Sequence, residues 1–490
     1  MATEEQYSSA VKLSPATRIF LSHKYNCYII AIIGFKTSID AEIVKEGLKQ
    51  TLIKHSRFSS KLVLKDESKS RNEPRWIPMP VNLEDHVIVP DLDQKIDDPD
   101  RFVEDYISHM TTSPLDLSKP LWELHLLNLR TSDSESVGVF RFHHTVGDGS
   151  SLMSLLLACT RQTSNPKALP TLPTATARRV DPAAAASSPR FLPAVSSALS
   201  LARNTFVDVL LFVATILFLR DTNTPIKGQK GVESTTKRFV HRSISLHDVK
   251  LIKDAMNTTI NDVLLGVTTA GLSRYLNRIY GAQNGKDDKE TKKMGNYLPK
   301  GIRLRARIAV NLRPAQGIQV PTETMAKEDS ISKTKLGNVV GFLHLPFTIS
   351  LQEDPLDYIR GAKSTVDRKK NSYGSLFTYL FNKLLLKTLG TKAAVAARYR
   401  DASSTTINFS NMAGPLEEIN LFGHPLAYLA ATGYGNPYAL AIQFVSYFNK
   451  MTIALAVDPN VIPDPHQLLD DLEESFKLIK NAVLKQGESV

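Results

Sequence analysis

Apolar residues recur at helical spacing in four segments of the chain. Residues 40–55 carry them at Ile43, Val44, Leu48, Leu52 and Ile53, which predicts a helix with Asp40 as its N-cap. The same spacing predicts helices over 150–162, over 261–280 and over 465–484. The last of these is amphipathic.

Short apolar runs bounded by polar turns predict strands. Such runs occupy residues 121–129, 137–144, 307–312 and 405–409. Residues 438–457 predict a β-hairpin that turns near Asn449 and Lys450. The chain is therefore expected to be α/β, of the α+β two-lobed kind, with polar loops at 285–300 and 322–335.

A long connection separates the two lobes. Residues 165–190 contain five prolines and the alanine run 183–186, so they cannot sustain a helix or a central strand. A largely apolar segment, 191–219, follows. The predicted division is a first lobe over 1–165, a connection over 166–234 that includes the apolar segment, and a second lobe over 235–490.

Composition excludes several classes of protein. The 490 residues are 42% hydrophobic and 22% charged, as in an ordinary globular chain and unlike a disordered or fibrous one. The net charge of +11 permits anionic partners such as lipid, acidic metabolites or nucleic acid, but it is not a motif. Two cysteines cannot build a disulfide framework, which indicates a reducing compartment. The acidic start of the chain is unlike a secretory signal peptide.

Residues 143–149, His-His-Thr-Val-Gly-Asp-Gly, carry the clearest candidate chemistry. They follow a predicted strand and precede a predicted helix. A neutral imidazole there can take a proton from a hydroxyl that attacks an acyl carbon. Since adjacent strand residues face opposite sides, one histidine should face the chemistry and the other the scaffold. Asp148 is placed to fix the loop, for example by pairing with an arginine, while Gly147 and Gly149 permit tight turning.

The alternative is that the paired histidines are structural, as such pairs at strand ends often are. A metal site is not expected, because the sequence contains neither an H-E-x-x-H motif nor a Cys/His cluster.

With these residues the sequence resembles the CoA-dependent acyltransferase superfamily, whose motif is HHxxxDG. It resembles more narrowly the plant-type wax ester synthase/diacylglycerol acyltransferases. Three further motifs match that family in order. Pro120, Leu121 and Trp122 resemble its PLW motif, and Asn261 with Asp262 its ND motif. Residues 411–415, Asn-Met-Ala-Gly-Pro, resemble its NVPGP motif, with Met412 and Ala413 in place of Val and Pro.

The resemblance implies a two-lobed pseudo-dimer with a tunnel between the lobes. It implies that His144 is the general base and that acyl-CoA is a co-substrate, with no bound cofactor. The acyl acceptors would be a long-chain fatty alcohol and diacylglycerol. His143, Asp148 and Gly149 would shape the site, and Asn261 and Asn411 would order it or polarise the thioester oxygen.

Each weaker motif also has a structural explanation. Asn261 and Asp262 suit a helix N-cap, and Pro120, Leu121 and Trp122 suit core packing. Asn411, Gly414 and Pro415 suit a plain turn.

Three other functions are weighed against this one. The plant HxxxD acyltransferases with soluble acceptors carry DFGWG in the second lobe, but both tryptophans here, Trp76 and Trp122, lie in the first. A condensation domain would need a carrier-protein partner. A catalytically silent lipid-binding relative is the non-enzyme alternative. Nucleic-acid binding is not expected, since the basic residues form no reading motif.

The apolar segment favours a membrane surface. Its cleanest part, 206–219, is interrupted by Asp208, a charge that disfavours a bilayer-spanning helix. A single crossing would also put the two lobes on opposite sides of the bilayer. Basic residues flank it at Arg178, Arg179, Arg190 and Arg203, and at Arg220, Lys227 and Lys230. We expect this segment to bind in the surface of the endoplasmic reticulum membrane, with both lobes in the cytosol. The alternative location is the plasma membrane. The alternative for the segment itself is a buried core helix of the fold.

Overall fold

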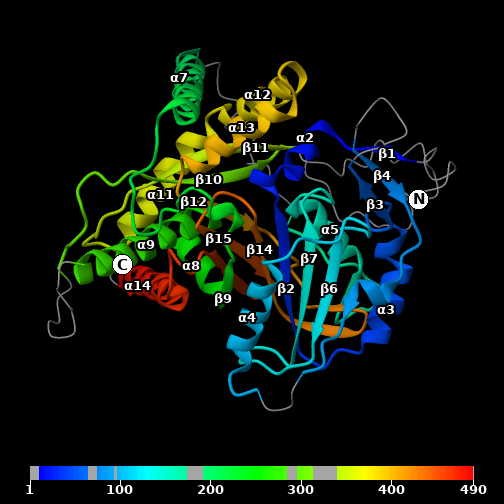
Figure 1. Cartoon of the computed structure of the whole chain (residues 1–490). Coiled ribbons are helices and arrows are strands. Elements are labelled where there is room, and N and C mark those ends of the chain that lie inside the picture. Colours follow the sequence, from blue (N-terminus) through cyan, green and yellow to red (C-terminus); the bar gives the residue numbers. More distant parts are fainter. Residues whose placement is uncertain are drawn as a thin grey trace.

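The computed structural model describes residues 10–64, 74–92, 96–173, 191–283, 295–312 and 339–488. Two mixed lobes lie side by side, each built on one large sheet (Figure 1). The two-lobed α/β prediction is confirmed. The chain ends in helix α14, on the second lobe.

The first lobe contains a seven-stranded sheet in the order β5-β6-β7-β2-β14-β13-β8. In that order the strands are Val87–Ile88, Trp122–Leu127, Ser136–His143, Tyr28–Phe35, His424–Tyr434, Ile419–Leu421 and Thr160–Gln162. Its helices are α3 (Ala41–Gln50), α4 (Pro99–Met110) and α5 (Gly149–Ala158). A small sheet, β1-β4-β3, is made by Val11–Lys12, Arg75–Pro78 and Ser60–Val63. All eight residues of β7 are buried, so this strand runs through the core.

The second lobe contains a six-stranded sheet in the order β11-β10-β12-β15-β16-β9. In that order the strands are Val340–Phe347, Leu304–Asn311, Ile407–Met412, Leu440–Tyr447, Lys450–Val457 and Arg238–Ser245. Its helices are α8 (Leu246–Ala255), α9 (Ile260–Gln283), α11 (Leu356–Lys370), α12 (Gly374–Thr388), α13 (Gly390–Ser403) and α14 (Pro465–Glu488). The apolar face of α14, including Leu468, Leu472 and Phe476, is buried in this lobe's core.

A short N-terminal segment joins the two lobes. It comprises α2 (Pro15–Arg18), η1 (Ile19–Leu21) and η2 (His23–Tyr25). Ile19, Phe20 and Tyr25 pack with Ala394 and Val395 of α13 in a separate apolar cluster. This cluster holds a first-lobe segment against a second-lobe helix beside the motif histidines.

Most predicted elements are confirmed, and two helices are shorter than predicted: α3 ends at Gln50, before the 3₁₀ helix η3 (Leu52–Lys54), and α5 also ends early. The Asp40 side chain caps α3 by accepting hydrogen bonds from the backbone N–H of Glu42 at 2.9 Å and of Ile43 at 3.3 Å. Helix α5 ends at Ala158, and Thr160–Gln162 forms β8 instead of the helix end. The cause is tertiary, because β8 pairs with β13, which lies about 260 residues further along the chain.

The predicted boundary of the second lobe needs a correction. Residues 419–434 were assigned to that lobe, but β13 and β14 belong to the first lobe's sheet. Strand β14 pairs antiparallel with β2 from Leu426↔Phe35 to Tyr434↔Tyr28. The physical reason is that β2 needs a partner on its second edge, which would otherwise leave a row of backbone groups unpaired in the core.

The apolar segment forms one helix, α7 (Phe191–Leu217). Its residues Ser196–Leu217 are long and apolar enough to cross a bilayer, with a mean hydropathy of 1.5, and 22% of that window is buried. Asp208 does not face lipid: it forms a buried ion pair with Lys369 of α11, at 2.7 Å between Oδ1 and Nζ. The helix is therefore docked on the second lobe along one face and is not a core helix.

Three predicted regions fall wholly or partly outside the described residues. These are the linker from residue 174 to 190, the loop over 284–294, and the loop that includes 322–335. The basic residues Arg178, Arg179 and Arg190 belong to the first of them.

Candidate active site

The two motif histidines lie at the end of β7, where the chain turns into α5. Strand β7 ends at His143, and Asp148 is the N-cap of α5. The backbone N–H of His144 donates to the carbonyl of Cys27 at 2.9 Å, and that of His143 to the carbonyl of Leu121 at 3.1 Å. The turn is thus tied to the strands on both sides, which fixes where the histidine side chains point.

His144 presents one face of its ring to a neighbouring aromatic side chain. The ring stacks on that of Phe20, with centroids 4.1 Å apart. Its Nδ1 is buried, with no hydrogen-bond partner on another described residue. Burial, with a smaller effect of Arg398, lowers the pKa of His144 to about 4, against opposing effects of the residue's own backbone and Asp148. The imidazole is therefore neutral at physiological pH, which is the form a general base requires.

His143 is held by the scaffold. Its Nδ1 lies 2.7 Å from Thr145 Oγ1 and its Nε2 lies 2.8 Å from Asn26 Oδ1. Burial, then the neighbouring His144 and Arg141, lower the pKa of His143 to about 3. With both nitrogens engaged, this ring has no nitrogen available to a substrate. His143 is thus the histidine that the scaffold holds, whereas the role of His144 toward a substrate stays a prediction.

Asp148 organises the start of α5. Its Oδ1 accepts hydrogen bonds from the backbone N–H of Ser151 at 3.0 Å and from the hydroxyls of Ser150 at 3.0 Å and Ser151 at 2.8 Å. These contacts to the two serines help to fix the loop, and pairing of Asp148 with an arginine stays a prediction. Next to it, a side chain on Gly149 would come within 2.9 Å of Met412 Cε, so the first-lobe motif touches the NMAGP motif of the second lobe.

The second-lobe motifs meet one another. Asn411 at the end of β12 donates from Nδ2 to Asn261 Oδ1 at 2.6 Å, although 150 residues separate them. Asp262 accepts from the hydroxyl of Thr258 at 2.6 Å and from the backbone N–H of Thr259 at 2.9 Å, so it caps the start of α9. Gly414 has a steric role, because a Cβ there would lie 2.1 Å from the carbonyl oxygen of Ser446. Pro415 accepts a hydrogen bond from Phe448 N–H.

The motif formed by Pro120, Leu121 and Trp122 is buried in the core, as core packing, its structural explanation, requires. Leu121 and Trp122 are fully buried, and the Trp122 indole N–H donates to the carbonyl of Phe58 at 3.0 Å. The motif still serves the site, since the Leu121 carbonyl holds the backbone of His143.

Several residues near the site were not found from the sequence. Phe20 contacts both the His144 ring and the Arg398 guanidinium, which lies 4.9 Å from the Phe20 centroid. Asn26 holds His143, and nothing in its sequence context distinguishes it. The surrounding stretches, 18–26 and 391–402, carry no motif, so only their packing reveals them.

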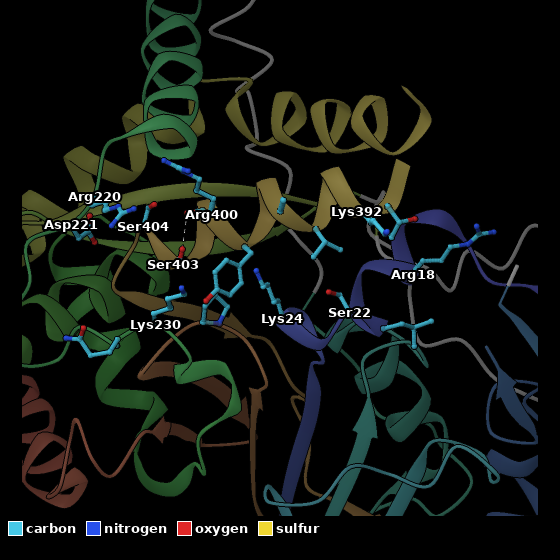
Figure 2. Close-up of a pocket in the computed structure, with 18 of the residues that line it drawn as sticks. Arg18, Ser22, Lys24, Arg220, Asp221, Lys230, Lys392, Arg400, Ser403 and Ser404 are labelled. Atoms are coloured by element: carbon cyan, nitrogen blue, oxygen red, sulfur yellow. Dashed lines mark hydrogen bonds between the residues drawn. The ribbon is translucent and has the colours of Figure 1, made fainter. Parts of the chain in front are cut away.

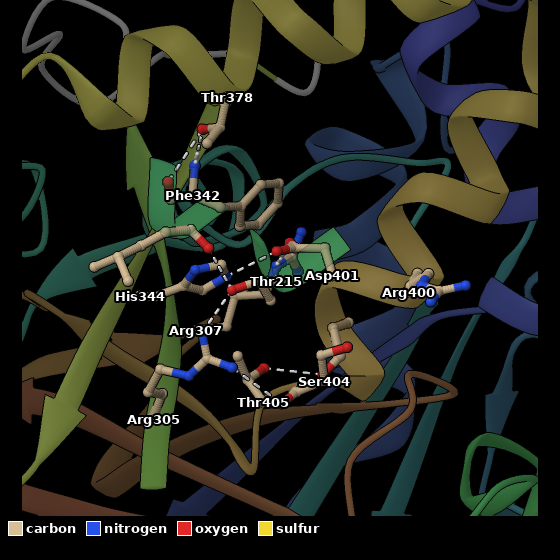
Figure 3. Close-up of polar contacts among 12 residues, drawn as sticks. Thr215, Arg305, Arg307, Phe342, His344, Thr378, Arg400, Asp401, Ser404 and Thr405 are labelled. Atoms are coloured by element: carbon tan, nitrogen blue, oxygen red, sulfur yellow. Dashed lines mark hydrogen bonds and ion pairs between the residues drawn. The ribbon is translucent and has the colours of Figure 1, made fainter. Parts of the chain in front are cut away.

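A buried polar network joins α13 to strands β10 and β11 (Figure 3). Arg307 pairs with Asp401 at 2.8 Å, and His344 Nε2 lies 2.8 Å from the other oxygen of that carboxylate. Burial favours the neutral acid, but His344 and Arg307 outweigh it and lower the pKa of Asp401 to about 2. Arg305 joins the end of α7 to this region, through Thr215 Oγ1 at 2.6 Å. The Arg307–Asp401 ion pair, the close approach of His344 and the Arg305–Thr215 hydrogen bond hold α13 and α7 against β10 and β11.

The described residues contain no group of three His, Cys, Asp or Glu side chains able to hold a metal ion. The arrangement instead offers one neutral imidazole, a rigid turn and contacts between motifs of both lobes. The tunnel implied by the resemblance stays a prediction.

Family models cover both lobes. The model "Wax ester synthase/diacylglycerol acyltransferase catalytic domain" matches residues 24–264, and "WS/DGAT C-terminal domain" matches residues 336–480.

Relatives that match over nearly the whole chain carry the same family name. The chain is 48% identical to wax ester synthase/diacylglycerol acyltransferase 11 of Arabidopsis thaliana, over 97% of this chain and 96% of that one. It is 50% identical to wax ester synthase/diacylglycerol acyltransferase 5 of the same plant, over 96% and 93%.

Solved structures show the same fold at low identity. The wax ester synthase/diacylglycerol acyltransferase from Marinobacter aquaeolei VT8 matches with a TM-score of 0.58 and 17% identity, over 96% of this chain and 99% of that one. The starter condensation domain of rhizomide synthetase in complex with C8-CoA and Leu-SNAC matches with a TM-score of 0.52 and 12% identity, over 98% and 96%. By its family models and its full-length relatives, the chain belongs to the wax ester synthase/diacylglycerol acyltransferase family.

Proposed function

We propose that this enzyme transfers a long-chain fatty acyl group from acyl-CoA to a long-chain primary alcohol, making wax esters, and to the free hydroxyl of diacylglycerol, making triacylglycerol. The observation that carries the proposal is the state of His144. Its ring is neutral, its Nδ1 is buried, and the residue is partly exposed, which leaves Nε2 for a substrate hydroxyl.

The reaction needs one base and no covalent enzyme intermediate. Nε2 of His144 takes the hydroxyl proton while the alcohol oxygen attacks the thioester carbonyl carbon. The carbon–sulfur bond then breaks, and the leaving thiolate of CoA takes the proton back from His144. Direct transfer is supported by the cysteines, because burial raises the pKa of Cys27 to about 12 and of Cys159 to about 11. Neither thiol is a nucleophile at neutral pH.

The other motif residues position this chemistry. Asn411 gives its amide N–H to Asn261, which favours an ordering role over direct polarisation of the thioester. The Asp148 cap and the Gly149–Met412 approach hold the turn that carries His144 against the second lobe. A displacement of about 1 Å in such a turn is enough to lower the rate about 100-fold.

We propose that the enzyme works on a membrane surface. Exposed apolar side chains project from α7 and from α12, which lie on the same side of the molecule (Figure 1). We call this the α7/α12 surface, and define it by Leu199, Phe206, Leu210, Leu211, Val213, Leu217, Phe218, Leu376, Leu380 and Leu384. Exposed apolar side chains grouped on two neighbouring helices suit the lipid phase that supplies a fatty alcohol or diacylglycerol.

The docking of α7 favours binding in the membrane surface over crossing the bilayer. Moving α7 from the lobe into the bilayer would break the Asp208–Lys369 ion pair and place an unpaired carboxylate in hydrocarbon, which is strongly unfavourable. Lys383 and Lys387 of α12 and Arg203 of α7 add positive charge near the apolar side chains, which suits anionic lipid. We propose the cytosolic face of the endoplasmic reticulum as the location, with the plasma membrane as the alternative.

The test of the function is a competition assay. Acyl-CoA is offered with hexadecanol and diacylglycerol together, and the products are separated. We expect wax ester and triacylglycerol from the wild type, and a loss of both by about 100–10,000-fold in His144→Ala. The matched control is His109→Ala, which removes an exposed histidine of α4.

Wild-type turnover in a folded His144→Ala variant would remove His144 from the mechanism. Acylation of a soluble acceptor alone would favour the HxxxD alternative. Acyl-CoA binding without any ester product would favour the silent lipid-binding alternative.

A further inference from the structure

A large cavity is lined mainly by three segments of the chain, and Leu64, Pro74 and Pro437 also contribute to its lining (Figure 2). Its volume is about 1240 Å³. One wall is the N-terminal segment around Arg18 and Lys24, and another is the stretch 220–230 that follows α7. The third is one face of α13, from Thr391 to Ser403. No motif marks any of these segments.

The cavity is strongly basic. Among the described residues that line it, seven are cationic, namely Arg18, Lys24, Arg220, Lys227, Lys230, Lys392 and Arg400. Within that described lining the one carboxylate, Asp221, is already paired with the buried Arg305 at 2.6 Å. Like charges around one hollow repel one another, so the cavity favours an anionic occupant.

Several of these cations are held by neutral groups. Lys227 donates to the carbonyl oxygens of Ser403 at 3.1 Å and Thr405 at 2.5 Å, and Arg400 donates to the carbonyl of Leu217 at 2.5 Å. Lys24 Nζ lies 5.5 Å from the centroid of the Tyr399 ring. Burial, which Asp221 only partly opposes, lowers the pKa of Lys227 to about 8. Carbonyl and ring contacts orient these side chains without neutralising their charge.

The cavity and the catalytic base share a wall. Leu21 and Ser22 line the cavity, and Phe20, next to them, stacks on His144. Helix α13 likewise turns Lys392 and Tyr399 toward the cavity and Arg398 toward Phe20. A ligand with an anionic end in the cavity and a long arm is therefore next to the chemistry.

We propose that this cavity binds the phosphate groups of an organic phosphate, and that the ligand is the nucleotide end of acyl-CoA. The choice of acyl-CoA rests on the function proposed above, whereas the phosphate site itself does not. A phosphorylated lipid head group carries the same chemistry and is the other source of phosphate near the α7/α12 surface.

Phosphate fits the chemistry of the lining. Lysine and arginine bind phosphate oxygens through short charge-assisted hydrogen bonds. Coenzyme A carries a diphosphate and a 3′-phosphate. Several cations spread over one cavity therefore match this ligand better than they match a ligand with a single carboxylate. Leu21, Val395, Ala396 and Pro437 give the same cavity an apolar part for a base.

The test uses the full-length protein and adenosine 3′,5′-bisphosphate as the probe, by calorimetry. The pocket variant is K24Q/K230Q/K392Q, which removes three exposed cations of the cavity. The matched control is K49Q/K54Q/K250Q, which removes the same charge from exposed positions elsewhere. In parallel, each protein is bound to phosphatidylcholine vesicles with and without phosphatidic acid. If the triple variant does not fold, the single variant Lys392→Gln replaces it in the same binding measurements.

We expect the pocket variant to bind the bisphosphate about tenfold more weakly or worse, with the control unchanged. The KM for acyl-CoA should rise, with kcat and the KM for hexadecanol close to wild type. Added salt should weaken wild-type binding more than it weakens the variant's.

Two other outcomes are decisive. If bisphosphate binding is unchanged and only the gain from phosphatidic acid is lost, the phosphate site stands and acyl-CoA as its ligand is overturned. If neither changes, the site is overturned. Neither result bears on the ester assay, since a failure of the proposed function would appear as missing ester in the wild type.

Discussion

The ring of His144 lies almost parallel to the ring of Phe20, with an angle of 10° between the planes and 4.1 Å between the centroids. Phe20 is itself buried, at 2% exposure, and the guanidinium of Arg398 lies 4.9 Å from its ring centroid. The stack covers one face of the base. It therefore restrains the direction of the His144 ring and contributes to the burial that lowers its pKa.

Phe20→Ala should move the acid limb of the rate profile to higher pH. In the wild type His144 is neutral above a pKa of about 4, so the rate falls as the pH drops through that value. Removing the phenyl ring lets water reach the imidazole, which raises its pKa toward about 6.5. The measurement is kcat/KM with hexadecanol against pH. An acid limb that stays in place would show that Phe20 does not control His144. Phe20→Leu, which keeps the site apolar, is the control and should shift less.

Asp148→Ala should lower both stability and activity. The substitution removes three hydrogen bonds to one carboxylate oxygen at the N-cap of α5, and loss of such a cap costs about 0.5–2 kcal/mol. Asp148→Asn keeps an acceptor oxygen, so its effect on the free energy of unfolding should be smaller.

Asp98→Ala is the matched control for this cap. Asp98 caps α4 through the backbone N–H of Arg101 at 3.0 Å, away from the turn that carries His144. Urea unfolding and the ester assay should show a loss of stability in both alanine variants and a loss of activity in Asp148→Ala alone. Equal activity of the two would contradict a role for Asp148 in positioning the turn.

The two motif glycines should differ in what they tolerate. Gly414→Ala should lower the yield of folded protein, because its Cβ would lie 2.1 Å from the backbone oxygen of Ser446, which cannot turn away. Gly149→Ala meets only the flexible end of Met412, at 2.9 Å, so it should fold but lose activity as Met412 moves.

The double variant Gly149→Ala, Met412→Ala tests that explanation. Removing the thioether should restore part of the activity, because the two substitutions act on one contact. Purely additive losses in the ester assay would show that the Gly149–Met412 approach is not the cause.

Serine at Phe206, Leu210, Leu380 and Leu384 should move the protein from the membrane to the soluble fraction. Each of these side chains is at least half exposed on the α7/α12 surface, and burying such a side chain contributes about 1.5–3 kcal/mol. Activity on a short soluble alcohol should survive better than activity on hexadecanol. Protein that stays with the membrane would contradict docking by this surface.

Phe212→Ser is the internal control. Phe212 is buried against Phe377 and Phe381, so this substitution should impair folding and not membrane binding.

Protease protection in sealed microsomes, with a tag at each end of the chain, distinguishes binding in the membrane surface from crossing of the bilayer. Both tags should be cleaved. One protected tag would show that α7 spans the bilayer.

Local pattern was enough to predict most of the elements and to single out His144 as the candidate base. The helix capped by Asp40, the hairpin near Asn449 and the strand–turn–helix around His144 each depend on a few adjacent residues. Such signals of periodicity, capping and turn chemistry are contained in the segment itself. The order of the four motifs, in turn, was enough to suggest the family.

The tertiary structure decided what lies next to what. That β14 completes the first lobe's sheet, that Asn411 meets Asn261, and that Phe20 covers His144 depend on contacts between residues 100 or more positions apart. The same holds for the basic cavity, whose three walls come from residues near 20, 225 and 395. Such contacts form because separate segments bury apolar surface and pair backbone groups together, and no single segment's pattern states its partner.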